Sequence, residues 1–172
     1  LAADGRFGEN KMRIYASQNA PFTIMYDSWK AHSRELVPMT PEEGRQNSEV
    51  ILGKVLSNRK PPYSLAGGLF DVLEKSGGDM FKVSNDEIVS WVVKYFSLEG
   101  YDLFPASACA VSSLKQALDA GIVKHDETVM LNVTGGGMLG ATRKGFILKE
   151  PDLILSPDLP AEEIIAAVDK LF

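Results

Sequence analysis

The sequence contains little of what several kinds of functional site require. Its 172 residues include one cysteine and two histidines. A single cysteine excludes an internal disulfide and a cluster of thiolate metal ligands. Neither histidine stands at metal-ligand spacing from another histidine, a cysteine or a carboxylate, so we expect no metal site. We expect Cys109, which lies in a run of small residues, to be a buried packing residue and not a nucleophile.

Other features that the sequence lacks exclude further classes of protein. Acidic residues outnumber basic ones and the net charge is −5, which argues against nucleic acid or an anionic membrane as a partner. No apolar run reaches membrane-spanning length and no secretory signal opens the chain, so we expect a cytoplasmic protein. The Gly-x-Ser-x-Gly motif of hydrolases does not occur, and we assign no catalytic side chain.

What the sequence does contain is an alternation of strand and helix patterns. This alternation predicts a single α/β domain over residues 1–172, with three layers and a mainly parallel sheet flanked by helices. Local signals mark several helix ends. Ser84 and Glu87 form a capping box, Pro105 suits a first helical position, and Gly121 suits a helix stop. The predicted strands are 11–17, 79–83, 129–133, 146–148 and 153–155, and the predicted helices are 22–36, 42–56, 67–75, 85–99, 105–120 and 160–172.

The stretch Thr128–Gly137 is the strongest candidate for a ligand site. An apolar, β-branched run ends in Thr134 and three glycines, which is typical of a buried parallel strand followed by a turn. In open α/β sheets, ligands lie beyond the carboxyl ends of the strands. Thr134 would present a hydroxyl there, and Gly135 and Gly136 would let another group approach the backbone closely. A glycine-rich turn with a threonine that caps a backbone group is the alternative interpretation.

Two other polar residues are candidate substrate contacts. Asn19 follows the first predicted strand, where its carboxamide is placed either to bind a polar ligand or to stabilise a turn. Arg59 lies in a loop that two prolines make rigid, and a guanidinium on a rigid loop suits an oxyanion. A solvated loop between helices is the alternative interpretation of Arg59 and the commoner one for such a stretch.

Three motifs in the last part of the chain occur together in one known group of enzymes: Pro105-Ala-Ser-Ala-Cys-Ala, Gly121-Ile-Val and Asp126-Glu-Thr-Val-Met-Leu-Asn-Val-Thr-Gly-Gly-Gly. In this order they resemble the C-terminal domain of the fold-type II pyridoxal-phosphate enzymes, which include threonine synthase, cysteine synthase and tryptophan synthase β. The resemblance implies that fold, with pyridoxal 5'-phosphate as the cofactor. It places the hydroxyl of Thr134 at the pyridine nitrogen of the cofactor, with Gly135 and Gly136 beside the ring.

Further motifs extend the resemblance to the cysteate synthase family: Asp4-Gly-Arg-Phe-Gly, Gln18-Asn-Ala-Pro-Phe, Met25-Tyr-Asp-Ser-Trp and Leu56-Ser-Asn-Arg-Lys-Pro-Pro-Tyr. This resemblance implies a β-replacement enzyme of coenzyme M biosynthesis that converts O-phospho-L-serine and sulfite into L-cysteate and phosphate. Threonine synthase, which uses O-phosphohomoserine, remains an alternative within the enzymes. A non-catalytic ligand-binding or interaction domain remains an alternative outside them.

The same resemblance predicts that this chain is part of a longer protein. The chain begins with Leu1 and not with Met. The Schiff-base lysine of the family lies upstream, and no lysine here stands in its motif. We therefore expect a C-terminal fragment that is inactive alone. Its partners would be the missing N-terminal half and small anionic substrates, and the full-length protein would form a homo-oligomer.

Overall fold

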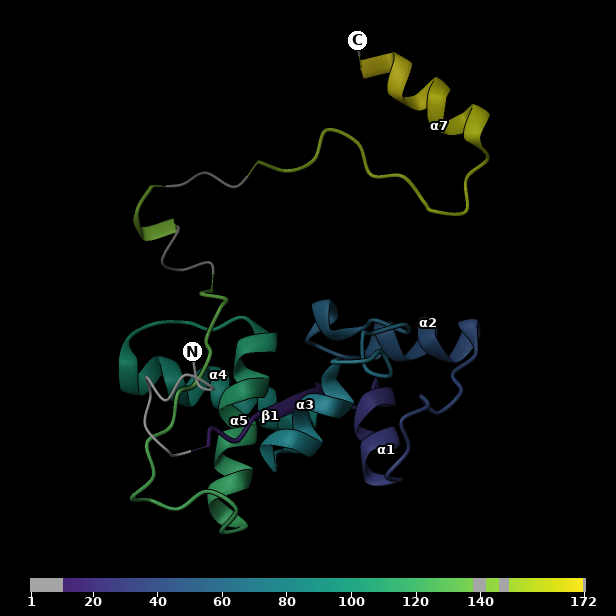
Figure 1. Ribbon diagram of the computed structural model, residues 1–172. Coiled ribbons are helices and arrows are strands. Elements are labelled where there is room, and N and C mark those ends of the chain that lie inside the picture. Colours follow the sequence, from purple (N-terminus) through teal and green to yellow (C-terminus); the bar gives the residue numbers. More distant parts are fainter. Residues whose placement is uncertain (1–10, 138–141, 146–148, 172) are drawn as a thin grey trace. The chain divides into compact units, whose positions relative to one another are not determined.

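A computed structural model describes residues 11–137, 142–145 and 149–171, which fall into two units, residues 1–140 and 141–172 (Figure 1). The first unit contains β1 (Tyr15–Asn19), α1 (Ile24–Lys30), α2 (Pro41–Val50), the 3-10 helix η1 (Lys54–Leu56), α3 (Leu69–Ser76), β2 (Asp79–Val83), α4 (Asn85–Glu99) and α5 (Pro105–Asp119). The second contains α7 (Ala161–Val168) and the 3-10 helix η2 (Asp169–Leu171). Within these ranges no helix has the length and apolar character needed to cross a membrane.

The first unit is an α/β structure built on a parallel pair of strands. β1 pairs with β2 in a register that runs from Tyr15 opposite Asp79 to Asn19 opposite Val83. Successive side chains of β2 point to opposite faces, as strand geometry requires. Phe81 and Val83 pack with residues of α5, whereas Met80 packs with Trp29 of α1 and with α3. Helices therefore cover both faces, as predicted. The described sheet has two strands, fewer than the sequence pattern predicts.

The predicted strand at residues 129–133 is wrong. This run has no strand conformation, and Val129, Met130 and Val133 are 44%, 86% and 36% exposed. Its β-branched sequence favours an extended strand, but a strand needs a partner, and neither β1 nor β2 pairs with it. The predicted strand 153–155 is also wrong, with Ile154 83% exposed. The predicted strand 146–148 lies outside the described residues.

Helix ends with local signals were predicted correctly. Ser84 accepts a hydrogen bond from the Glu87 amide while the Glu87 carboxylate accepts one from the Ser84 amide, so the predicted capping box is confirmed at the start of α4. Gly100 follows α4 with a left-handed φ of 70°. Pro105 is the first residue of α5, and Gly121 lies just beyond its end with φ of 67°. These boundaries depend on residues within one helical turn.

The predicted helices 22–36 and 42–56 extend well past the ends of α1 and α2, and long-range contacts explain one of these differences. α1 ends at Lys30 and not near residue 36, because His32 has a left-handed φ of 51°. α2 ends at Val50, whose carbonyl accepts a hydrogen bond from Asn85 Nδ2 at 2.9 Å. Ile51 then takes an extended conformation and is completely buried. The chain leaves the helix at this point because a distant side chain and an apolar core hold it.

Asp79 connects the start of β2 to α1. Its Oδ1 atom accepts hydrogen bonds from Trp29 Nε1 at 2.7 Å and from Lys30 Nζ at 2.6 Å. Burial alone would raise the pKa of this carboxyl group. Hydrogen bonds from Lys30, from the Met80 amide and from Trp29 outweigh burial and lower the pKa below its ordinary value.

The lowered pKa of Asp79 predicts a loss of stability in acid. A carboxyl group whose pKa is depressed by folding contributes stability above its unfolded pKa of about 3.9 and loses that contribution as the pH falls through the folded pKa. We expect urea unfolding to show this decrease below about pH 4 in the native sequence and a smaller one in Asp79→Asn. If the free energy of unfolding falls equally with pH in the two proteins, Asp79 does not make the hydrogen bonds described here.

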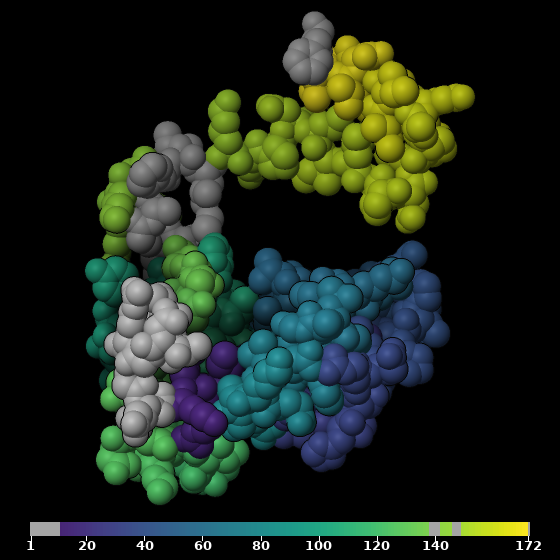
Figure 2. Space-filling model, viewed as in Figure 1, coloured from purple at the N-terminus to yellow at the C-terminus, as the bar shows by residue number. Residues whose placement is uncertain are grey.

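The surface of the first unit includes the residues that lead into β1. In the space-filling view purple atoms, the colour of residues 11–14 and of β1, are visible at the surface (Figure 2), and Met12 is 69% exposed. The interior begins at the end of the strand, where Gln18 and Asn19 are 1% and 0% exposed. β1 therefore runs from the surface into the core and ends next to the loop that follows α2.

Candidate functional site

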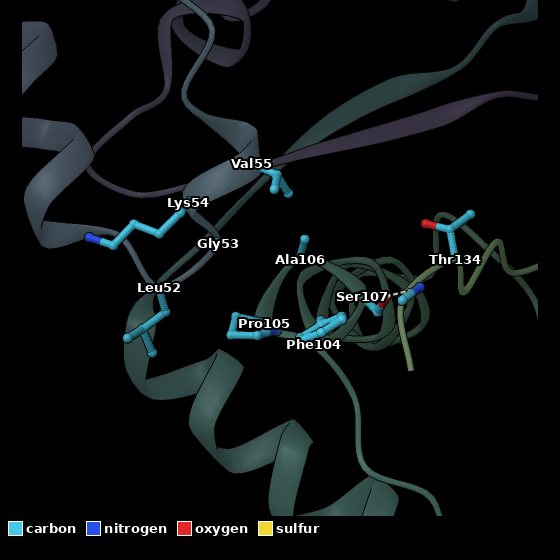
Figure 3. A pocket seen from close by; sticks show the side chains of 10 residues that line it. Leu52, Gly53, Lys54, Val55, Phe104, Pro105, Ala106, Ser107 and Thr134 are labelled. Carbon is cyan, nitrogen blue, oxygen red and sulfur yellow. Dashed lines mark hydrogen bonds between the residues drawn. The ribbon is translucent and has the colours of Figure 1, made fainter. Parts of the chain in front are cut away.

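The candidate site is an open pocket of about 290 Å³ in the first unit (Figure 3). One wall comes from residues 52–55, which lead into η1 and form its first two positions, and the other from Phe104 and the start of α5 together with Thr134 and Gly135. Most of the lining is apolar, and its two hydroxyl groups belong to Ser107 and Thr134. The lining residues are Leu52, Gly53, Lys54, Val55, Phe104, Pro105, Ala106, Ser107, Thr134 and Gly135.

Thr134, proposed from the sequence as a ligand contact, lies at this pocket. Its side chain is exposed, and its oxygen points to the side on which Val55 and Ala106 lie (Figure 3). The hydroxyl makes no hydrogen bond with the residues that the structure describes. A hydroxyl can both donate and accept a hydrogen bond. Thr134 therefore keeps both capacities for a molecule that enters the pocket.

The glycine run is held against the start of α5 by backbone contacts. The Gly135 amide donates to Ser107 Oγ at 3.0 Å, and the Gly135 carbonyl accepts from the Phe104 amide at 3.2 Å. The Gly137 amide donates to the Asp102 carbonyl at 2.7 Å, and Gly136 forms an antiparallel bridge with Leu103. These contacts place Thr134 opposite the wall formed by residues 52–55.

The three glycines differ in the space around them. A Cβ atom on Gly135 would lie 2.9 Å from Phe104 Cδ2 and 3.1 Å from Ser107 Oγ, so close packing against α5 requires glycine there. A Cβ atom on Gly137 would lie within 2.2 Å of the Asp102 carboxyl carbon. A Cβ atom on Gly136 would meet no atom within 4 Å. Gly136 is not among the lining residues but follows Gly135, which is, and the space where its Cβ atom would lie is open.

The structure does not bring Asn19 and Arg59 to the pocket lining. Asn19 is completely buried, and its carboxamide is hydrogen-bonded within the chain, including to the Gly53 amide at 2.9 Å. Arg59 is exposed, and its aliphatic stem lies against the backbone of Gly44 in α2. A substrate contact by either residue stays a prediction.

The positive charge in the lining is turned away from the pocket. Lys54 is one of the lining residues, but its ammonium group donates hydrogen bonds to the carbonyl oxygens of Ser48 at 2.8 Å and Glu49 at 2.6 Å. Cations favour the last carbonyl groups of a helix, and here they belong to α2. Figure 3 shows the Lys54 side chain extending away from Ala106 and Thr134. An anionic group in this pocket would therefore need another source of positive charge.

Sequence reasoning missed one wall of the pocket. Residues 52–55 lie within a predicted helix, and no local signal separates them from it. Ser107 was noted only as part of a run of small residues, but it is 4% exposed and holds Gly135. Two residues away on α5, Cys109 is buried as predicted, and burial raises the pKa of its thiol to about 11. In the described ranges no three His, Cys, Asp or Glu side chains gather as metal ligands would.

Comparison with known proteins links this chain to one family of enzymes. The chain is 38% identical to the cysteate synthase of Methanosarcina acetivorans over 167 aligned residues. The alignment covers 95% of this chain and 40% of the relative. It is 38% identical over 171 residues to the cysteate synthase of Methanocella paludicola, with 98% of this chain and 40% of the relative covered. This chain is homologous to part of cysteate synthase.

A third cysteate synthase, from Methanoculleus marisnigri, is 43% identical over 138 residues, or 80% of this chain and 32% of the relative. No family model matches the chain. The chain spans about 40% of the length of the first two relatives, so residues outside it make up the larger part of those enzymes. The resemblance to cysteate synthase inferred from the sequence motifs is confirmed.

Proposed function

We propose that this chain is the C-terminal part of a pyridoxal-phosphate-dependent enzyme that makes L-cysteate and phosphate from O-phospho-L-serine and sulfite. The observation that carries the proposal is the free hydroxyl of Thr134 at an apolar pocket, in a chain homologous to cysteate synthases. The pocket suits the cofactor because one wall is apolar and the glycine run presents backbone without side chains.

In this proposal the chain supplies one side of the cofactor site. When bound, pyridoxal 5'-phosphate supplies the electron sink that replacement at the β-carbon of an amino acid requires. Thr134 donates a neutral hydrogen bond to the pyridine nitrogen and leaves that nitrogen unprotonated. Gly136 leaves the space beside the ring free, and Gly135 allows the glycine run to pack closely against the start of α5. The lysine that carries the cofactor and the groups that bind its phosphate belong to the rest of the full-length polypeptide.

Replacement of the Thr134 hydroxyl tests the cofactor site. In the full-length protein we expect Thr134→Ala to raise the dissociation constant for pyridoxal 5'-phosphate about tenfold, because a hydrogen bond contributes roughly 0.5–1.5 kcal/mol net. Thr134→Ser should restore most of the affinity. Titration of the apoenzyme, followed by the cofactor absorbance, measures both constants.

Thr128 provides a matched control for Thr134. It is exposed in the same segment but is not among the pocket-lining residues, so Thr128→Ala should leave cofactor affinity unchanged. Equal affinities of Thr134→Ala and the native protein would remove Thr134 from the cofactor site. A native full-length protein that binds no pyridoxal 5'-phosphate would overturn the proposed function and favour a non-catalytic binding domain.

The substrate is decided by a direct comparison. Full-length protein is incubated with O-phospho-L-serine and sulfite, and separately with O-phospho-L-homoserine. The proposal requires sulfite-dependent formation of cysteate in the first reaction. Threonine formation in the second reaction, without cysteate in the first, would instead support threonine synthase.

A further inference from the structure

The wall of the pocket opposite Thr134 begins with an irregular segment that needs external support. Leu52 and Gly53 lie between the end of α2 and the start of η1. Backbone amides in irregular segments have no regular helix or sheet partners, and a buried amide without a partner is costly. Gly53 is buried, so its amide in particular requires an acceptor. Two asparagine side chains from other elements supply the acceptors.

Asn19 provides the first of these contacts from the end of β1. Its Oδ1 atom accepts from the Gly53 amide at 2.9 Å. Its Nδ2 atom lies within hydrogen-bond distance of the carbonyl oxygens of Val83, at 3.0 Å, and of Ala20, at 3.1 Å. Asn19 thus ties the pocket wall to the ends of both strands. The side chain is completely buried, which fixes its position.

Asn85 provides the remaining contacts from the first residue of α4. Its Oδ1 atom accepts from the Leu52 amide and from Asn19 Nδ2, both at 3.1 Å. Its Nδ2 atom donates to the Val50 carbonyl at 2.9 Å. The two carboxamides are therefore joined to each other, and together they bind three backbone groups of residues 50–53. We refer to Asn19 and Asn85 as the asparagine pair.

We propose that the asparagine pair positions the wall formed by residues 52–55 so that the pocket holds its ligand. Each contact runs from the sheet or from α4 to the wall, and neither side chain lines the pocket itself. Asn19 and Asn85 are thus positioning residues that act through the Leu52 and Gly53 backbone. This inference rests on the proposed function, because the ligand in question is pyridoxal 5'-phosphate.

Asn85 is the better position for a test, because it is half-buried whereas Asn19 is completely buried. In the full-length protein, Asn85→Ala should speed hydrogen exchange in the peptide that contains Leu52 and Gly53. It should also raise the dissociation constant for pyridoxal 5'-phosphate about tenfold. Asn85→Asp keeps an acceptor for Leu52 and should recover most of the cofactor affinity. An Asn85→Asp protein that folds but binds the cofactor no better than Asn85→Ala would contradict the role of this acceptor.

Asn58 offers a matched control. It is exposed in the loop after η1, and its Oδ1 atom accepts a local hydrogen bond from the Lys60 amide at 2.9 Å. Asn58→Ala should change neither exchange at residues 50–56 nor cofactor affinity. If Asn85→Ala does not fold, Asn85→Asp tests the positioning role in its place. This variant loses the donor to the Val50 carbonyl, so it should slightly speed hydrogen exchange at residues 50–56.

The outcomes separate this inference from the proposed function. If the native protein binds pyridoxal 5'-phosphate but Asn85→Ala leaves its affinity unchanged, the positioning role is overturned and the proposed function stands. Unchanged exchange at Leu52 and Gly53 in Asn85→Ala overturns the positioning role as well. If the native protein binds no pyridoxal 5'-phosphate, both proposals fail together.

Discussion

Gly136→Ala should reduce the affinity of the full-length protein for pyridoxal 5'-phosphate by about 10- to 100-fold without weakening the fold. A Cβ atom at this position would meet no atom of the described chain within 4 Å, and no left-handed φ is found there. The chain itself therefore has room for alanine. A ligand packed against the glycine run would clash with the added methyl group. A methyl group placed in a close-packed interface typically costs about 1–3 kcal/mol, so cofactor binding should weaken while the fold does not.

Two measurements on Gly136→Ala separate the ligand from the fold. Urea unfolding of the apoprotein should give a free energy equal to or slightly above the native value, because alanine restricts the unfolded chain. Cofactor titration should show the loss of affinity. Gly135→Ala is a poor substitute, since its Cβ atom would press on Phe104 and Ser107 even without a ligand. Unchanged cofactor affinity in a folded Gly136→Ala protein would place the cofactor ring elsewhere.

Gly78→Ala should destabilise the protein by about 3 kcal/mol. A Cβ atom on Gly78 would lie 1.7 Å from the Ile14 carbonyl oxygen and 2.8 Å from the Ile14 carbonyl carbon. These are backbone atoms, so they cannot rotate away as a side chain would. The clash can be relieved only if the backbones of residues 14 and 78 move apart. These residues lie where β1 and β2 begin to pair, next to the pair Tyr15 and Asp79.

The free energy of unfolding from urea titration measures this effect. Gly136→Ala serves as the control, because it makes the same chemical change where the chain leaves open space. The difference between the two variants isolates the clash with Ile14 from the general effect of adding a methyl group. A stability for Gly78→Ala equal to that of the control would contradict the close approach of residues 14 and 78.

The parts of the fold that local residues determine were predictable. β2 was predicted at its observed residues, and the ends of α4 and α5 were predicted from Ser84, Pro105 and Gly121. Each of these residues acts on backbone groups within one turn, so its effect can be inferred without knowing what lies nearby. Thr134 was likewise predictable as a ligand candidate, because the contrast between an apolar run and three glycines is visible in the sequence.

The parts that depend on distant partners were not predictable. Residues 129–133 have a strand sequence, but whether they form a strand depends on a pairing partner that periodicity does not supply. Leu52 and Gly53 leave the predicted helix because Asn19 and Asn85 bind their amides. Asn19 was proposed as a substrate contact because a carboxamide at a strand end suits both a ligand and a turn. Only the folded arrangement reveals its bond to the Gly53 amide.

The pairing of β1 with β2 has a consequence for how the protein is made. Asn19 and Val83 meet although they are 64 residues apart in the chain. A ribosome that adds about 5–20 residues per second needs roughly 3–13 seconds to make the intervening segment. During that time β1 has emerged without its partner and carries unpaired backbone groups. Nascent chains of this protein should therefore recruit chaperones between the appearance of the first strand and that of the second.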